Sequence, residues 1–393
     1  MIDFELSEQD KASVERAHEI AEKHFRPISR YYDEHEHEEP QELIDLMWSR
    51  RGEGGLMGLG VDGALRTEEL CWGDAGLALA MPGPGLGGAA VFAAGTKEQW
   101  AKFLARFNEG KPKWGAMAMT EPGCGSDTSA ISATAVRDGD DWVINGEKIF
   151  VTFGHRALDL SDGIIVVWAS VDKSAGRAGM KSFVVEAKTP GCRVEKLEKK
   201  LGIRASDTAT VVFDNCRVPF DHILGKAEVK TKTEGFKGAM ATFDVTRPLV
   251  AAQALGVTRA ALDMLRDEID RQGIKIRYDL PRSKQTALER DFIEMEANWR
   301  AAHLLMIRAM WQLGNGQSNA LEASMSKAKA GRAATLITQR AVELMGPLGY
   351  SRKYLFEKFM RDAKINDIFE GTGQINTLIV ARRVLDFNRD QLK

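Results

Sequence analysis

The sequence predicts a mainly α-helical protein that carries a β domain in the middle of its chain. Apolar residues recur at three- and four-residue intervals in the first and last parts of the 393-residue chain, which is typical of amphipathic helices. Between these parts, short segments rich in β-branched residues alternate with turn signals, which is typical of strands. We therefore expect an N-terminal helical domain at 1–112, a β-sandwich or barrel at 113–228 and a C-terminal helical domain at 229–393.

The first region carries two well-bounded helix patterns. Residues 7–25 read SEQDKASVERAHEIAEKHF, where Ser7 stands at the capping position and Asp10 completes a capping box. The segment KEQWAKFLARFNEGK repeats the helical period and is ended by Gly110 and Pro112. These signals predict that helices continue to the start of the middle region.

The middle region shows turn signals between short apolar segments. Asp138–Gly139 and Asn145–Gly146 are dipeptides that favour tight turns, and Pro190–Gly191 interrupts the chain further on. The segments GIIVVWAS, KSFVVEA and TATVVFDN are short and rich in β-branched residues. We expect each of them to form a strand.

Three long helical patterns fill the last region. They read RPLVAAQALGVTRAALDMLRDEIDR, SKQTALERDFIEMEANWRAAHLLMIRAMWQL and ALEASMSKAKAGRAATLITQRAVELMG. Pro248 suits the first turn of a helix, because backbone N–H groups there have no partner within the helix and proline lacks this group. The first of the three helices is therefore expected to begin near Pro248.

Composition and charge exclude several classes of protein. The chain holds 54 Lys and Arg against 56 Asp and Glu, a net charge of −2, so no strong field favours nucleic acid or an anionic membrane. No uncharged apolar stretch is long enough to predict a membrane span. The four cysteines form no CxxC pair and the histidines form no cluster, which predicts reduced thiols, a cytoplasmic location and no metal site.

The segment AMTEPGCGSDTSA (118–130) is a candidate binding loop. Its prolyl and glycyl breaks are followed by Ser126, Asp127 and Thr128, which predicts a tight turn rich in backbone N–H groups and hydroxyls. Such a turn can hold a phosphate or the edge of a flavin without a charged side chain. The pattern alone fits an ordinary surface turn as well.

The segment KIFVTFG (148–154) is a second candidate. On a regular strand Phe150 and Thr152 point to the same face, because they lie two residues apart. An aromatic ring and a hydroxyl on one face can cover and hydrogen-bond a flat heterocycle. A half-buried strand with no ligand explains the pattern equally well.

Two acids in the last region have unusual neighbours. Asp244 in FDVTRP precedes Arg247 by three residues, and the two form either a simple ion pair or a clamp on part of a ligand. Glu370 in NDIFEGTGQIN lies between Phe369 and Gly371, in a bend between an apolar approach and a polar loop. An acid on a helix surface is usually a solvated charge, so the setting of Glu370 needs another explanation.

Taken together, these segments resemble the acyl-CoA dehydrogenase family in order and spacing over nearly the whole chain. The longest matches are MAMTEPGCGSD and MRDAKINDIFEGTGQINTLIVAR, with KIFVTFG and FDVTRP between them. The resemblance implies an N-terminal helical domain, a middle β domain and a C-terminal four-helix bundle. It also implies bound FAD and the α,β-dehydrogenation of an acyl-CoA thioester to the trans-2-enoyl-CoA.

By resemblance, Glu370 is the base that removes the α-proton, while the β-hydrogen leaves as hydride to the flavin N5. One branch of the family places its base on the helix near FDVTRP, at the position that matches Thr246. Threonine cannot serve as that base, so the sequence resembles the branch that uses the C-terminal acid. Burial would raise the pKa of the acid towards working pH.

Further contacts are implied by the matching positions. The residues that match flavin contacts are Met117, Ala118, Met119, Thr120, Gly125, Ser126, Phe150, Thr152, Thr372 and Gln374, with Arg271, Glu343 and Gly346 reaching the FAD of a neighbouring subunit. The residues that match substrate contacts are Ser126, Asp244, Arg247 and Gly371.

Two departures from the family pattern concern the contacts between subunits. Family members usually carry Arg-x-x-Phe-Gly where this chain keeps Arg271 but has Ile274 and Lys275 in place of the last two residues. The glutamine that is usual before the next flavin-contacting loop is Glu343 here. An acid close to a pyrophosphate is unfavourable unless it points away, so a hetero-oligomer or weaker cofactor binding stays open.

The resemblance implies an acyl-CoA substrate, a homotetramer or dimer, and an electron-transferring flavoprotein as acceptor. Two alternatives share the fold: an acyl-CoA oxidase, and a non-catalytic chain that is either a flavin-poor subunit or a DNA-associated member. The near-neutral charge and the presence of Glu370 argue against the non-catalytic alternative.

Overall fold

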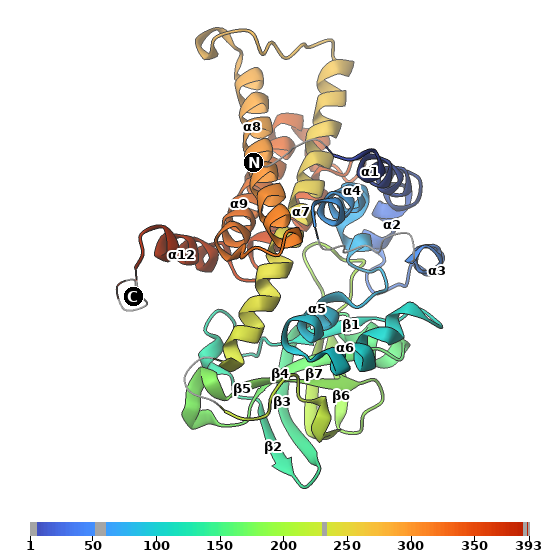
Figure 1. The fold of residues 1–393 in the computed structure, drawn as a ribbon. Coiled ribbons are helices and arrows are strands. Elements are labelled where there is room, and N and C mark those ends of the chain that lie inside the picture. Colours follow the sequence, from blue (N-terminus) through green and yellow to red (C-terminus); the bar gives the residue numbers. More distant parts are fainter. Residues whose placement is uncertain (1–5, 52–59, 230–233, 388–390, 392–393) are drawn as a thin grey trace.

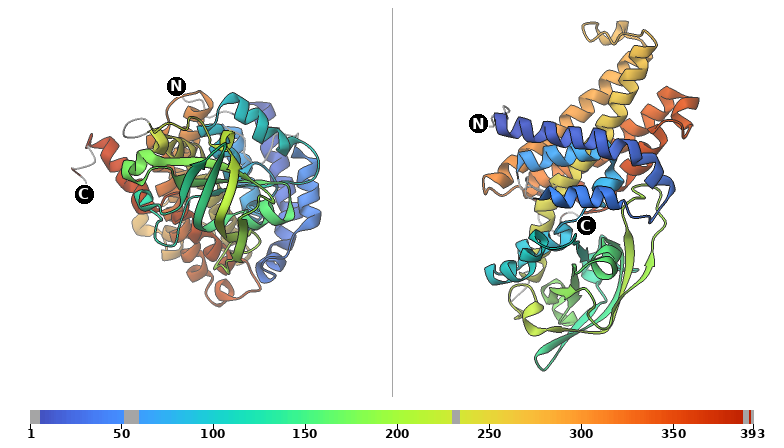
Figure 2. Two further views of the ribbon diagram at one scale, coloured as in Figure 1. Left: turned by 90° about the horizontal axis from the view of Figure 1, so that it is seen from below. Right: turned by 90° about the vertical axis from the view of Figure 1, so that its right-hand side faces the viewer.

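The computed structural model describes residues 6–51, 60–229, 234–387 and 391, and it has three regions (Figure 1). Helices form the first and last regions, and a β-sheet forms the middle one. Figure 2 shows from the side that the sheet lies at one end of the molecule. The predicted order of a helical, a β and a second helical region is confirmed.

The first region is built from short helices. They are α1 (Glu8–Ile20), α2 (Ser29–Glu34), α3 (Gln41–Ser49), α4 (Val61–Ala78), α5 (Gly85–Ala94) and α6 (Lys97–Leu104). The Ser7 hydroxyl oxygen accepts the backbone N–H of Asp10 at 3.1 Å, so the predicted cap at Ser7 is confirmed. The Asp10 carboxylate accepts the Ser7 hydroxyl at 2.7 Å instead of the Ser7 backbone N–H, so the predicted capping box is wrong.

The middle region is one curled sheet of seven strands. They are β1 (Gly115–Ala118), β2 (Thr134–Asp138), β3 (Asp141–Thr152), β4 (Ile164–Ser170), β5 (Met180–Glu186), β6 (Cys192–Leu197) and β7 (Thr208–Pro219). The order is β1-β4-β2-β3-β7-β6, and β5 pairs with β4. The three segments predicted as strands correspond to β4, β5 and β7.

One predicted turn is present and the other is wrong. Asp138 pairs with Asp141 across a tight hairpin in which Gly139 has φ +64°. Asn145–Gly146 does not reverse the chain, because β3 runs through it with a shift in register against β7. The left-handed φ of Gly146, +149°, is used at this bulge rather than at a hairpin.

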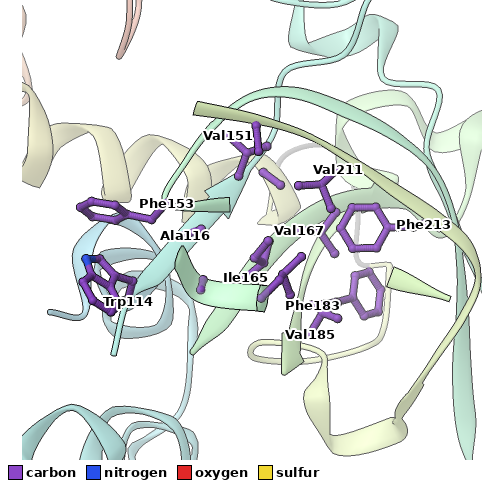
Figure 3. Packing of buried hydrophobic residues seen from close by; sticks show 14 of the residues in the cluster. Trp114, Ala116, Val151, Phe153, Ile165, Val167, Phe183, Val185, Val211 and Phe213 are labelled. Carbon is purple, nitrogen blue, oxygen red and sulfur yellow. The ribbon is translucent and has the colours of Figure 1, made fainter. Parts of the chain in front are cut away.

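Strand β4 is buried on both faces, which explains its unbroken apolar run. On one face, Ile164 and Val166 pack in a cluster with Phe103 of α6. The other face contributes to the core inside the curled sheet (Figure 3). That core includes Trp114, Ala116, Val151, Phe153, Ile165, Val167, Phe183, Val185, Val211 and Phe213.

The last region is built on three long helices, α7 (Glu234–Arg271), α8 (Ala287–Gly314) and α9 (Ala320–Met345). The shorter α10 (Pro347–Tyr350), α11 (Phe356–Lys364) and α12 (Gly373–Val384) follow, and α11 and α12 pack against α9.

The expected start of the first long helix near Pro248 is wrong, because α7 contains Pro248 in its interior. A proline inside a helix costs about 3 kcal/mol. The apolar residues that follow it, among them Leu249 and Leu255, are buried in the helical core. Their burial outweighs the local preference of the proline.

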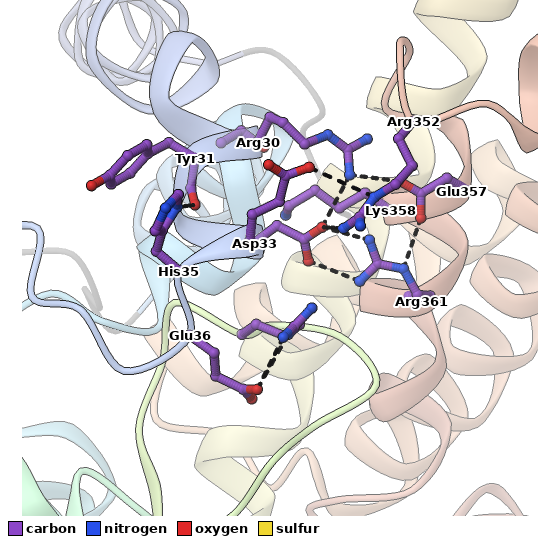
Figure 4. Close-up of polar contacts among 12 residues, drawn as sticks. Arg30, Tyr31, Asp33, His35, Glu36, Arg352, Glu357, Lys358 and Arg361 are labelled. Carbon is purple, nitrogen blue, oxygen red and sulfur yellow. Dashed lines mark hydrogen bonds and ion pairs between the residues drawn. The ribbon is translucent and has the colours of Figure 1, made fainter.

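A buried charge cluster joins the three regions, and Figure 4 shows the part of it around Asp33 and Arg361. Lys358 of α11 contacts Asp74 of α4 and Asp362 of α11, at 2.5 Å in each case. The other carboxylate oxygen of Asp362 accepts the backbone N–H of Ile203, in the loop before β7, at 2.6 Å. Arg361, the residue before Asp362, pairs with Asp33 of α2 at 2.6 Å. The cluster fixes α11 against both other regions.

Candidate active site

The turn at Glu370 has an unusual backbone. Glu370 and Gly371 have φ values of +57° and +87°, both in the left-handed region, between the short helix η10 (Ile365–Asp367) and α12. The left-handed conformation costs a non-glycine residue about 1–2 kcal/mol. Strain of this kind persists where the surrounding structure holds it, which is common at functional sites. The predicted bend at Glu370 is therefore present, and it is a tight one.

The carboxylate of Glu370 lies against α7. The hydroxyl of Thr246 donates a hydrogen bond of 2.8 Å to Oε2 of Glu370. Burial raises the pKa of Glu370, and the Thr246 hydrogen bond and the positive charges of Arg247 and Lys327 only partly offset this. Glu370 is thus in direct contact with the position at which, by the resemblance, one branch of the family carries its base, and of the two residues only Glu370 is an acid.

Arg247 lies beside the same turn. It is 3% exposed, and its Nη1 contacts the Asp244 carboxylate at 3.2 Å and the Ser324 hydroxyl at 3.4 Å. Its Nε is buried and has no hydrogen-bond partner among the described residues. A Cβ placed on Gly371 would lie 4.0 Å from this Nε. Asp244 and Arg247 form an ion pair, and the unused donor next to the turn fits a ligand clamp as well.

The two predicted flavin segments lie side by side. The backbone N–H of Ile149 donates to the carbonyl of Thr120 at 2.9 Å. The ammonium group of Lys148 donates to the carbonyl of Met119 at 3.1 Å. Met119 and Thr120 are half-buried, whereas the whole of Ala118 is buried, so Ala118 presents no surface to a ligand in the single chain.

The alternation predicted for Phe150 and Thr152 does not come from a regular strand. Strand β3 has a shift in register between Lys148 and Val151, and Phe150 has φ +57°. The Phe150 side chain is 61% exposed and Thr152 is half-buried. A bulge of this kind redirects side chains, and here it presents an aromatic ring at the end of the sheet that carries the candidate loop.

The candidate loop between β1 and β2 is closed by two backbone hydrogen bonds between Glu121 and Cys124, at 2.9 and 3.1 Å. Gly125 and Ser126 are exposed, and a Cβ on Gly125 would meet no atom within 4 Å. The loop therefore leaves open space beside its backbone. Together with the exposed ring of Phe150, this fits a flat cofactor.

A buried ion pair below this loop was not predicted from the sequence. The Glu121 carboxylate contacts the Lys148 ammonium at 2.8 Å and accepts the backbone N–H groups of Ser132 and Ala133 at 2.7 and 2.9 Å. Burial alone would raise the pKa of Glu121, but the bonds from Lys148 and Ser132 outweigh it and lower the pKa. The pair joins β3 to the loop that follows β1.

We expect Glu121→Gln to reduce the free energy of unfolding by about 1.5–3 kcal/mol near neutral pH, because it removes the charged partner of buried Lys148. Since the folded-state pKa lies below the ordinary 4.5, the contribution is present above pH 4.5 and is lost as the pH falls through the folded value. Denaturant unfolding at several pH values measures the difference from wild type. The exposed Glu147 on β3 supplies the control, Glu147→Gln, and an equal loss in both variants would contradict the assignment.

The remaining predicted flavin contacts lie away from Glu370 in this chain. Arg271 ends α7, about 36 Å along the helix from Arg247, and pairs with Glu268. Glu343 is exposed near the end of α9 and pairs with Arg340 at 2.5 Å, and Gly346 follows with φ +55°. Figure 1 shows that α7 ends far from the β-sheet. Within one chain these positions therefore lie far from the Glu370 turn.

The first turn of α12 carries the last two predicted contacts. The hydroxyl oxygen of Thr372 accepts the backbone N–H of Ile375 at 3.2 Å and so caps the helix. Gln374 is exposed. Ile368, two residues before Glu370, is 50% exposed in the single chain, so it does not exclude water from the turn there.

Two further features concern the part of the chain that the structure describes. It contains no group of three or more His, Cys, Asp and Glu side chains that could hold a metal ion. No helix there is both long enough and apolar enough to cross a bilayer.

Family models match nearly the whole chain. Those described as the N-terminal, middle and C-terminal domains of acyl-CoA dehydrogenase match residues 7–111, 116–216 and 233–385. The short-chain specific acyl-CoA dehydrogenase of Bos taurus is 36% identical over 97% of this chain and 91% of its own. An acryloyl-CoA reductase (NADH) of Anaerotignum propionicum is 32% identical over 98% of this chain and 96% of its own.

Solved structures show the same similarity. Butyryl-CoA dehydrogenase from Megasphaera elsdenii is 32% identical, with a TM-score of 0.85 over 98% of this chain and 100% of the other. A structure described as an electron transferring flavoprotein of Acidaminococcus fermentans is 36% identical, with a TM-score of 0.86 over 98% and 100%. The chain therefore belongs to the acyl-CoA dehydrogenase family, whose members are oxidoreductases that act on CH–CH groups.

Proposed function

We propose that the protein is an FAD-dependent acyl-CoA dehydrogenase that converts an acyl-CoA thioester to its trans-2-enoyl-CoA, with Glu370 as the α-proton base. The contact between Thr246 and Glu370 at a left-handed turn carries the proposal. It holds one oxygen of the carboxylate and leaves the other for a substrate. Family membership implies a flavin and acyl-CoA chemistry.

The environment of Glu370 suits a base for a weakly acidic carbon. A partly buried carboxylate with a raised pKa is a stronger base than a solvated one, and a pKa closer to working pH favours proton transfer. The α-carbanion character that develops must be met by preorganised donors, which are commonly worth several kcal/mol. The backbone N–H of Glu370 is the donor that this chain supplies by family analogy.

When bound, FAD accepts the β-hydrogen as hydride. Met117, Met119, Thr120 and Thr152 would hold its ring system, since the structure brings their two segments together. The open side of Gly125 and Ser126 leaves room for the substrate thioester beside them. Arg247 and Asp244 would orient the acyl group at the Glu370 turn.

Short-chain and butyryl-CoA dehydrogenases among the relatives support a short acyl chain as substrate. We further propose an electron-transferring flavoprotein as acceptor, a homotetrameric assembly and a cytoplasmic location. The flavoprotein described for Acidaminococcus fermentans supports the choice of acceptor.

The purified protein is expected to be yellow and to lose its flavin absorbance when a short-chain acyl-CoA is added without oxygen. A panel of acyl-CoA esters of increasing length and branching identifies the substrate. Peroxide formation in air at a rate matching turnover would identify an oxidase instead. A protein that holds FAD but is not bleached by any ester of the panel would refute the proposal.

The opposite direction is a second candidate, because one relative is named an acryloyl-CoA reductase. The same carboxylic acid that removes an α-proton can return it to an enoyl-CoA. Reoxidation of the photoreduced flavin by short enoyl-CoA esters, compared with reduction by the saturated esters, measures which direction is favoured.

We expect Arg271→Ala to weaken FAD binding by roughly tenfold, the loss of one charge-assisted hydrogen bond to a phosphate of a neighbouring subunit's cofactor. Arg271 is exposed at the end of α7 and is held only by Glu268 among the described residues. Flavin retained after dialysis measures the effect. Arg282→Ala, in the exposed segment that follows α7, serves as the control, and equal retention in both variants would show that Arg271 does not contact FAD.

A further inference from the structure

A buried lysine lies behind the turn that carries Glu370. Lys327, in the middle of α9, is only 1% exposed. Its ammonium group donates a hydrogen bond to the backbone carbonyl of Gly371, the residue that follows Glu370. A buried ammonium group is costly unless it is paired, and the function proposed above does not yet use this one.

The turn needs support because its two central residues both have left-handed φ values. The Gly371 carbonyl accepts hydrogen bonds from Lys327 and from Nδ2 of Asn376, the latter at 2.8 Å. A carbonyl oxygen has two lone pairs, so both of its acceptor sites are used. The two donors come from different helices, α9 and α12, and together they fix the turn against the bundle.

A close approach of α9 to the turn makes this contact possible. Gly331, one helical turn after Lys327, faces the end of η10, where a Cβ would lie 2.6 Å from the carbonyl of Asn366. Any side chain at Gly331 would push η10 and the turn away from α9. Gly331 and Lys327 therefore both contribute to the contact between α9 and the Glu370–Gly371 turn.

Charged groups reach the turn from several elements. Arg247 and Lys327 both favour the ionised form of Glu370, and Asp367 in turn attracts Lys327. The charged side chains around the turn are Asp244 and Arg247 on α7, Lys327 on α9, Asp367 on η10 and Arg383 on α12. Lys327 differs from Arg247 in that it also bonds to the turn itself.

We propose that Lys327 is a positioning residue for the base: it holds the Glu370–Gly371 turn through the Gly371 carbonyl and stabilises the ionised form of Glu370. The second part rests on the proposed function, because it assigns proton removal to Glu370. The first part is a statement about the turn alone.

The lysine carries its charge at neutral pH. Burial lowers its pKa to about 8, against the attraction of Asp367 and Glu370. The ammonium form therefore predominates below pH 8 and is lost as the pH rises through that value. This places its charge beside Glu370 over the acidic and neutral range, in which a carboxylate base must lose its own proton.

Hydrogen exchange tests the hold on the turn without any assay of activity. In Lys327→Met, backbone amides in a peptide spanning residues 366–376 are expected to exchange roughly tenfold faster, and Lys327→Arg is expected to restore most of the protection. The control is Lys329→Met on the same helix, whose ammonium group bonds to Asn298 at 2.7 Å instead. Equal exchange rates for this peptide in Lys327→Met and in Lys329→Met would show that Lys327 does not hold the turn.

The pH dependence of anaerobic flavin reduction tests the effect on the base. Without the lysine charge, the pKa of Glu370 rises further, so Lys327→Met is expected to need a higher pH for full rate and to be roughly tenfold slower at the acidic end. Lys327→Gln keeps a hydrogen-bond donor and lacks the charge. Its pH profile is therefore expected to shift to higher pH as in Lys327→Met, while its turn is held more firmly than in that variant. Lys327→Arg and Lys329→Met should keep the wild-type profile.

If the rate of flavin reduction at acidic pH is unchanged in both Lys327→Met and Lys327→Gln, the proposed stabilisation of ionised Glu370 is overturned. If Lys327→Met does not fold, Lys327→Gln and Lys327→Arg decide the same question. A wild-type protein that no acyl-CoA reduces would refute the proposed function, while the exchange measurement would still decide whether Lys327 holds the turn.

Discussion

Glu370→Gln is expected to retain FAD and to slow flavin reduction by acyl-CoA roughly 10²–10⁴-fold or more, the usual contribution of a general base. Glutamine keeps the shape of the side chain and an oxygen that can accept the Thr246 hydroxyl, so the turn should survive the change. What is lost is the negative charge and the ability to accept the α-proton. The effect should therefore appear in the chemical step and not in cofactor binding.

Rapid mixing under anaerobic conditions measures flavin reduction directly, and the flavin spectrum of the purified variant reports FAD content. Asp244→Asn is the informative comparison. Asp244 is another acid near the turn, and burial raises its pKa too, against the charge of Arg247. Because Asp244 is paired with Arg247, its loss should weaken substrate binding more than the chemical step.

Two results would contradict the assignment of the base. Flavin reduction at the wild-type rate in Glu370→Gln would exclude Glu370 from proton removal. A loss of rate in Asp244→Asn that exceeds the loss in Glu370→Gln would transfer the role to Asp244.

The arrangement of the chain in three regions was predictable from the sequence because its signals are local. Periods of three and four residues report which face of each helix is buried, and short β-branched runs mark β4, β5 and β7 as strands. The errors also have local causes. Pro248 has the preference of a first turn and Asn145–Gly146 that of a hairpin, and in both cases packing against distant residues outweighs the preference.

The candidate site was predictable only in part. Glu370, Arg247 and the loop at Gly125 stand in recognisable segments, so the sequence pointed to them. The contacts that hold these segments were not predicted, because the two residues of each contact lie far apart along the chain. Thr246 is 124 residues from Glu370, and Lys327 is 44 residues from Gly371.

Buried polar side chains in general are difficult to predict from the sequence. A lysine in the pattern SMSKAKAG looks like a solvated charge on a helix, and only the fold shows that Lys327 is inside. The signal that was available is the surrounding run of small residues. Such a run allows a neighbouring segment to approach the helix closely, as Gly331 does here.

The charge cluster around Lys358 should have the largest effect on stability. The side chains of Lys358, Asp74 and Asp362 are 3%, 1% and 2% exposed. The desolvation of the Lys358 ammonium is outweighed by the two carboxylates, which raise its pKa. Burial raises the pKa of Asp362. Removal of the lysine would leave two carboxylates in the interior without a counter-ion.

We expect Lys358→Met to lower the free energy of unfolding by about 3–5 kcal/mol, the usual cost of breaking a buried ion pair from one side. Denaturant or thermal unfolding measures the loss. Lys364→Met, on the same helix but with its side chain 43% exposed, should change stability by less than about 1 kcal/mol. A similar small change in Lys358→Met would contradict a structural role for the cluster.

Replacing Asp74 and Asp362 as well as Lys358 shows whether stability is lost because charges are left unpaired or because packing around the lysine is lost. In a triple variant that adds Asp74→Asn and Asp362→Asn to Lys358→Met, no buried charge is left unpaired, so much of the stability should return. The amide introduced by Asp362→Asn would keep an oxygen for the backbone N–H of Ile203. Because α11 leads through η10 into the Glu370 turn, recovery of stability should be accompanied by recovery of flavin reduction if the cluster serves the site by fixing this helix.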